Sequence, residues 1–131
     1  MLMNDKNESA VIETIGIRES VYIAKTQSRY PDFPFDEPDS VSRALGDLFS
    51  MWGLDPENPF KDFIHPGETA LIKPNWVNDR NPRGYGIESL ITHSSLIKHV
   101  AERILKAMDY TGTIVIGDAP IQDCDFDGLL R

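Results

Sequence analysis

The sequence has little cysteine and no long apolar run. Its single cysteine, Cys124, excludes an internal disulfide and an iron–sulfur cluster held by this chain's cysteines alone. No apolar run approaches the roughly 20 residues that a membrane-spanning helix needs. Residues 1–6 also lack the apolar segment of a secretory signal. We therefore expect a cytoplasmic protein that is not embedded in a membrane.

Cations are scarce as well. The chain of 131 residues has 13 lysines and arginines against 21 aspartates and glutamates, which gives a net charge of −8. Nucleic acids and anionic membranes require clustered cations, so neither is expected as a partner, although a small basic pocket is compatible with this charge. The apolar content of 40% and the charged content of 26% are those of an ordinary globular domain.

Familiar catalytic and cofactor motifs are missing too. The sequence contains no Gly-x-Gly-x-x-Gly, no phosphate-binding loop ending in Gly-Lys-Ser or Gly-Lys-Thr, no His-Glu-x-x-His, no Gly-x-Ser-x-Gly and no Cys-x-x-Cys. A standard nucleotide-binding site is therefore not predicted. Function has to be sought in the placement of individual polar residues.

The N-terminal part of the chain is predicted to contain one strand. Residues 1–18 are typical of a tail or a weak edge strand, and residues 19–131 of a single α/β domain. The β-prone run over residues 20–24 predicts the strand. The segment 26–37, which contains two prolines and three aromatic residues, predicts a long loop.

A helix is expected to open at Pro38, with Asp36 or Asp39 as its N-cap. Gly53 is a natural stop for it. Its apolar residues recur at the helical period and predict one buried face, in which Trp52 belongs to the core. These residues are Val41, Leu45, Leu48, Phe49 and Trp52.

The second half of the chain alternates strand and helix. It predicts a strand over residues 69–73, a loop over 74–91, a helix that begins near 92–94 and ends with Gly112 at the C′ position, and a strand over 113–116 that is buried on both faces. This order predicts an α/β fold with a short parallel sheet and flanking helices. Because three strands and two helices are few for such a layer, we expect an incomplete N-terminal portion of a larger α/β domain.

Ligands bind beyond the carboxyl ends of the strands in open α/β sheets. The predicted topology brings polar residues from three segments to that edge: Lys73 and Asn75 after one strand, Thr92, His93 and Ser94 at the helix start, and Asp118 after the last strand.

Each of these residues has a chemical use. Lys73 and Asn75 are predicted to hold an anionic group, a phosphate or a carboxylate, with help from Thr92 and Ser94 at the helix start. Asp118 is the candidate general base or ligand of a divalent metal, and His93 is the candidate proton carrier. The first hypothesis is therefore a small-molecule enzyme domain, with no reaction specified.

Structural roles compete with these functional ones. One of residues 92–94 is an N-cap in the alternative interpretation, and Asp118 caps a helix that begins near Pro120. His65 and His99 are interpreted as structural or surface residues. The second hypothesis is a non-catalytic binding or assembly module, with a second copy or a missing C-terminal portion as partner. Its exposed contact residues are Tyr30, Phe33, Phe35 and Trp76.

Three segments together resemble the family known as domain of unknown function 362. They are residues 67–77 (Gly-Glu-Thr-Ala-Leu-Ile-Lys-Pro-Asn-Trp-Val), 91–93 (Ile-Thr-His) and 114–120 (Ile-Val-Ile-Gly-Asp-Ala-Pro). The resemblance covers roughly residues 67–123 and implies a longer α/β parent of the subgroup without a ferredoxin module. Where many relatives have Pro-Glu, this chain has Ser94 and Ser95. The resemblance implies a setting in surface-polysaccharide metabolism but carries no settled activity.

Overall fold

The computed structural model describes residues 20–27, 29–36 and 38–130. Within these ranges the chain forms helices α2 (Ser40–Met51), α3 (Ser94–Ala107) and α4 (Phe126–Leu129) and strands β1 (Thr69–Ile72) and β2 (Thr113–Ile116). The predicted tail or edge strand over residues 1–18 lies outside the described residues. The observed combination of helices and a short parallel sheet confirms the predicted α/β class.

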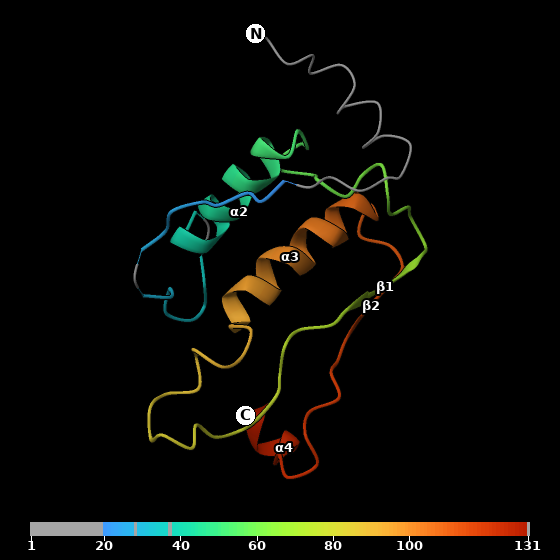
Figure 1. Cartoon of the computed structure of the whole chain (residues 1–131). Helices are drawn as coiled ribbons and strands as arrows, with labels where there is room; N and C mark the ends of the chain where they lie inside the picture. Colours follow the sequence, from blue (N-terminus) through green and yellow to red (C-terminus); the bar gives the residue numbers. More distant parts are fainter. Residues whose placement is uncertain (1–19, 28, 37, 131) are drawn as a thin grey trace, which may run out of the picture.

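The two strands lie side by side and run in the same direction (Figure 1). Their register pairs Thr69 with Thr113 and Ile72 with Ile116. Helix α3 makes the crossover between them, as a parallel connection requires. The expected strand at 69–73 ends one residue earlier than predicted, so Lys73 is the first residue beyond the carboxyl end of β1.

Helix α2 begins where the sequence contains a good cap. The Asp39 carboxylate accepts hydrogen bonds from the amides of Val41 and Ser42, both at 2.8 Å, and this selects Asp39 rather than Asp36 as the N-cap. The prediction that Trp52 is a core residue is wrong. Trp52 is 46% exposed, because it lies at the C-cap beyond the last turn that packs on α3.

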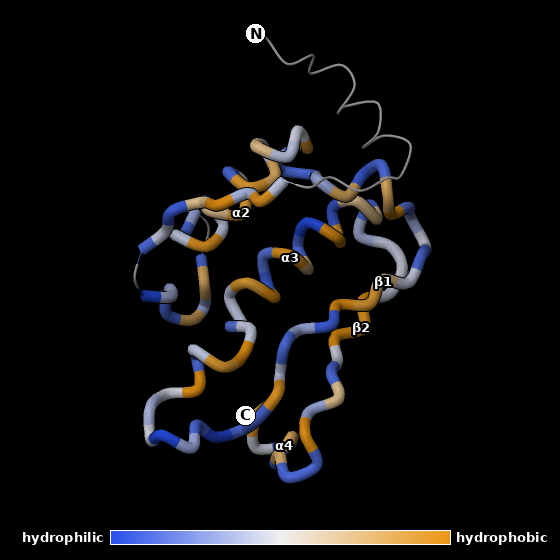
Figure 2. The backbone as a smooth tube through the Cα atoms, viewed as in Figure 1, coloured by the Kyte–Doolittle hydropathy of each residue, from blue (hydrophilic) through white to orange (hydrophobic). Residues whose placement is uncertain are grey.

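The core lies around α3. This helix packs against α2 on one side and against β1 on the other (Figure 1). Its apolar residues appear as orange stretches between blue ones along the tube in Figure 2. The buried apolar side chains of this segment are Ile97, Ile104, Ala107 and Met108.

The prediction that Gly112 is the C′ residue of α3 is wrong. Met108 is the C-cap, and Asp109 and Tyr110 follow with positive φ values, so the helix ends earlier than predicted. Gly112 has a φ of +98°, and a side chain there would overlap the backbone carbonyl of Glu68. A glycine is needed at this position because the chain passes so close to the start of β1.

Two strand predictions are wrong. Residues 20–24 have no strand pairing, and Val21 and Ile23 are exposed. Strand β2 is not buried on both faces, since Val115 and Ile116 are both exposed. Helix α3 covers one face of the sheet, whereas the in-register pair of Leu71 and Val115 lies exposed on the opposite face. A β-prone sequence forms a strand only when a neighbour supplies the ladder.

Candidate functional site

The carboxyl ends of β1 and β2 bring together two residues that are 45 positions apart in the sequence. The pairing of the strands continues past their ends, where the amide of Gly117 donates to the carbonyl of Ile72 at 3.1 Å. Lys73 and Asp118 follow directly on either side. The Nζ atom of Lys73 lies 2.5 Å from Oδ1 of Asp118.

Both oxygens of the Asp118 carboxylate accept hydrogen bonds. Its Oδ2 accepts a hydrogen bond from the amide of Trp76 at 2.6 Å, and its Oδ1 accepts one from the amide of Ala119 at 2.8 Å. The hydrogen bond from Lys73, followed by those two amides, lowers the pKa of Asp118 to about 2. Asp118 is therefore ionised at neutral pH and acts as an acceptor. It caps no helix near Pro120, because the next helix, α4, begins at Phe126 with Asp125 as its N-cap.

Asn75 and Thr92 form a second pair beside the first. The amide of Asn75 donates to Oγ1 of Thr92 at 2.8 Å, and the amide of Thr92 donates to the carbonyl of Asn75 at 2.9 Å. The Asn75 side chain donates to the carbonyl of Leu90 at 3.3 Å. These bonds fasten the loop after β1 to the chain that enters α3. The same loop continues into Trp76, whose amide reaches Asp118.

His93 is the N-cap of α3, which confirms the alternative structural interpretation of residues 92–94. Its Nδ1 atom accepts a hydrogen bond from the amide of Ser95 at 3.2 Å and lies 2.8 Å from the Ser95 hydroxyl. The ring is stacked on Tyr30 at a centroid distance of 4.0 Å. Burial lowers the pKa of His93, while the charge of Glu88 opposes this effect. The neutral imidazole is the form that can accept a bond at Nδ1.

The six predicted site residues therefore do not form one connected set of contacts. Lys73 and Asp118 are in direct contact, and Asn75 and Thr92 are joined to them through the Trp76 amide. His93 instead lines an open cleft of about 530 Å³ together with Arg29, Tyr30, Pro31, Asp32, Glu88 and Ser89. Ser94 is the exposed first residue of α3. Asp118 is not among the residues that line this cleft.

The four aromatic residues of the alternative hypothesis do not form one exposed set. Phe33 is 83% exposed, but Phe35 is only 8% exposed, so the prediction that Phe35 is exposed is wrong. Phe35 is buried because it packs edge-on against His93, with ring centroids 5.7 Å apart. Trp76 is half-buried, 6.0 Å from Phe126 of α4.

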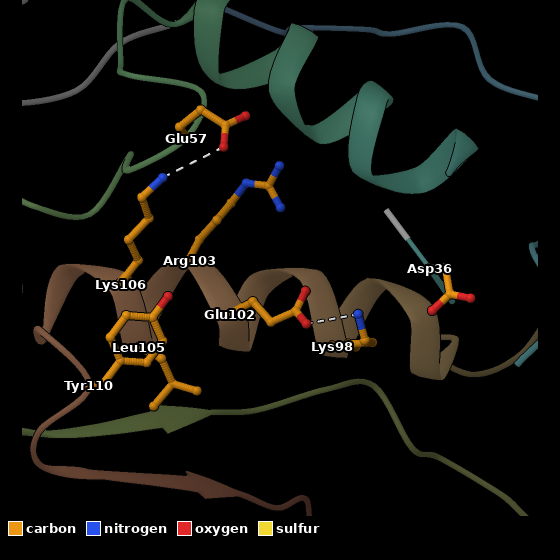
Figure 3. Close-up of a pocket in the computed structure, with 8 residues that line it drawn as sticks. All are labelled: Asp36, Glu57, Lys98, Glu102, Arg103, Leu105, Lys106 and Tyr110. Atoms are coloured by element: carbon orange, nitrogen blue, oxygen red, sulfur yellow. Dashed lines mark ion pairs between the residues drawn. The ribbon is translucent and has the colours of Figure 1, made fainter. Parts of the chain in front are cut away.

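Sequence reasoning missed a charged cleft of about 560 Å³ along α3 (Figure 3). Four of its charged side chains form two ion pairs: Lys98 with Glu102 at 2.7 Å and Lys106 with Glu57 at 3.6 Å. The first pair has the i,i+4 spacing that could have been recognised in the sequence. The lining is completed by Asp36, Arg103, Leu105 and Tyr110.

Two further features bear on the expected ligands and setting. Among residues 20–27, 29–36 and 38–130, no group of three His, Cys, Asp or Glu side chains is arranged to hold a metal ion. None of the helices in these ranges is long and apolar enough to cross a membrane. The divalent metal suggested for Asp118 stays a prediction.

Comparison with known proteins adds no relative. No family model, no curated protein and no solved structure matches the chain. The resemblance to the domain of unknown function 362 family therefore stays a prediction.

Proposed function

We propose that the carboxyl ends of β1 and β2 bind a small anionic molecule, a phosphate or a carboxylate, through the ammonium group of Lys73. One observation carries this proposal. The Lys73 side chain is 68% exposed, whereas that of its partner Asp118 is 4% exposed. A buried carboxylate thus fixes the position of a cation that remains open to solvent.

The chemistry of the ammonium supports binding. It has three N–H donors, and Asp118 needs only one of them. Because the carboxylate restrains the lysine, less side-chain entropy is lost when a ligand binds. Asn75 and Thr92 lie on the loop that leads to the Trp76 amide, so they support the position of the site. Ser94 at the start of α3 extends the proposal as a further polar contact.

Fewer observations support a catalytic role for Asp118 and His93. A carboxylate with a pKa of about 2 is a weak general base at neutral pH, so Asp118 is better suited to anchoring Lys73 or to ligating a divalent metal. His93, the proposed proton carrier, lines a cleft whose lining does not include Asp118. We therefore place binding before catalysis in this proposal. Through the family resemblance, the proposal extends to a cytoplasmic role in surface-polysaccharide metabolism.

Exposed apolar side chains favour the alternative of an assembly module. Phe33 is exposed, and so are Leu71 and Val115 on the uncovered face of the sheet. A second copy of the chain that covered this face would bury aliphatic surface. In that case the Lys73–Asp118 pair only stabilises the ends of the strands.

Thermal unfolding with and without anions tests the proposal. The probes are inorganic phosphate, acetate and a phosphorylated sugar, added to the wild type and to Lys73→Ala. A probe at about 100 times its Kd stabilises the fold by about 2.7 kcal/mol and raises the midpoint by several degrees. We expect this shift in the wild type and its loss in Lys73→Ala.

Lys61→Ala is the matched control, because Lys61 also pairs with a carboxylate, that of Asp55 at 3.2 Å, but away from the strand ends. It should keep the full shift. An equal shift in Lys73→Ala and the wild type would contradict the anion site. A wild type that responds to no probe and sediments as a dimer would favour the assembly module.

A further inference from the structure

Strand β2 has an outer edge whose backbone groups are unpaired. The amides of Thr113 and Gly117 donate to carbonyls at the two ends of β1, at 3.0 Å and 3.1 Å, so both residues face β1. Because the backbone groups of successive strand residues point to opposite sides, Ile114 and Ile116 direct their amides and carbonyls away from β1. Within the described part of the chain, these outward groups have no hydrogen-bond partner.

The two faces of β2 are apolar and partly exposed as well. Val115 is 46% exposed on one face, and Ile116 is 43% exposed on the other. Helix α3 packs mainly against β1, and Figure 3 shows β1 between this helix and β2. The helix therefore leaves the outer edge of β2 clear. An aliphatic strand with such an edge is a surface that another extended backbone can join.

The residues of this edge favour a second copy of the same chain as the partner. Residues 112–117 contain no charged side chain, although the whole chain has a net charge of −8. Two copies can therefore meet here without placing like charges opposite each other. An antiparallel pair with its two-fold axis at Val115 places Ile114 of each copy opposite Ile116 of the other, so that each outward amide faces a carbonyl. The edge is thus complementary to itself.

We propose that two copies of this chain associate through the outer edges of β2 and form one continuous sheet in the order β1, β2, β2, β1. Leu71 and Val115, which are paired in register within each copy, then form one aliphatic row across the joined sheet. The second copy lies beside the sheet rather than over its exposed face. Lys73 and Asp118 lie beyond the paired segment, so this interface does not depend on the anion site.

A proline at an outward position tests the pairing. Ile116→Pro removes an amide that points to the second copy and leaves the hydrogen bonds between β1 and β2 in place. Because the two-fold axis repeats this loss, the dissociation constant of the dimer, measured by sedimentation, should rise at least about tenfold. Leu71→Pro is the matched control, since it removes an outward amide from the opposite edge of the sheet. It should dimerise like the wild type.

Hydrogen exchange of the wild type needs no variant to fold. The amides of Ile114 and Ile116 should exchange more slowly as the protein concentration rises, whereas the amide of Leu71 should exchange at the same rate throughout. A chain that stays monomeric at millimolar concentration would overturn the proposal. So would a dimer that is weakened by Leu71→Pro and not by Ile116→Pro. Lys73→Ala should dimerise like the wild type, so a failure of the anion site leaves this test unaffected.

Discussion

Two aspartates of this chain accept nearly the same set of hydrogen bonds, but their side-chain partners differ in exposure. Asp39 accepts two backbone amides and the side chain of His99, which lies 60 residues away. Asp118 accepts two backbone amides and the side chain of Lys73, which lies 45 residues away. The difference lies in the side chain that pairs with each carboxylate. His99 is fully buried, and Lys73 is mostly exposed.

Burial of the partner side chain, rather than the carboxylate's own bonds, therefore separates the structural contact from the candidate binding site. A buried pair must be satisfied internally, because an unpaired buried polar group is costly. An exposed ammonium on a fixed carboxylate can be contacted by a ligand at little cost. The helical side of the molecule therefore carries stability, and the strand-end side carries the candidate site.

The largest expected effect is the loss of stability when a buried side chain beside α3 is shortened, and it tests this division between the two sides. Met108→Ala removes a fully buried side chain beside α3 and should lower the free energy of unfolding by about 2–5 kcal/mol. Val115→Ala, on the exposed face of the sheet, should cost about 1 kcal/mol or less. Urea unfolding of both variants measures the contrast. Equal losses would mean that the sheet face is covered in solution.

A second prediction concerns the acid dependence of Asp118. Its pKa is about 2 in the folded chain and 3.8 ordinarily, so its contribution to stability is complete above pH 3.8 and disappears as the pH falls toward 2. The difference in unfolding free energy between the wild type and Asp118→Asn should close over that interval. Asp127→Asn, at an exposed aspartate, should show no such closing. A constant difference would mean that Lys73 does not hold this carboxylate.

The smallest expected effect concerns the pH dependence of the His93 cap. Burial depresses the pKa of His93 below its ordinary 6.5, so its capping contribution is present above that pH and is lost on acidification. The cap is worth about 1 kcal/mol. His93→Asn supplies a cap that does not titrate, and should flatten the pH dependence of thermal unfolding below pH 6.5. An unchanged slope would exclude the imidazole cap.

The sequence predicted what depends on local patterns. The helical spacing of apolar residues predicted α2 and α3. Asp39 and residues 92–94 predicted where these helices begin, because capping needs only a side chain and its neighbouring amides. The polar residues after β1 and β2 were found because parallel strands share one edge. The Asp39–His99 contact was missed, since nothing local links residues that far apart. Strand 20–24 failed for the same reason: propensity does not supply a partner.

Gly112 has a consequence for how sequences of this fold vary. Its backbone passes against Glu68 at a φ of +98°, so every side chain is excluded there on steric grounds. In a library of all single substitutions selected for folded protein, this position should be depleted of all nineteen alternatives. Gly53 also has a positive φ but open space around it, and should tolerate asparagine. A diverged chain with this connection between α3 and β2 should therefore keep Gly112, whereas it can lose Gly53.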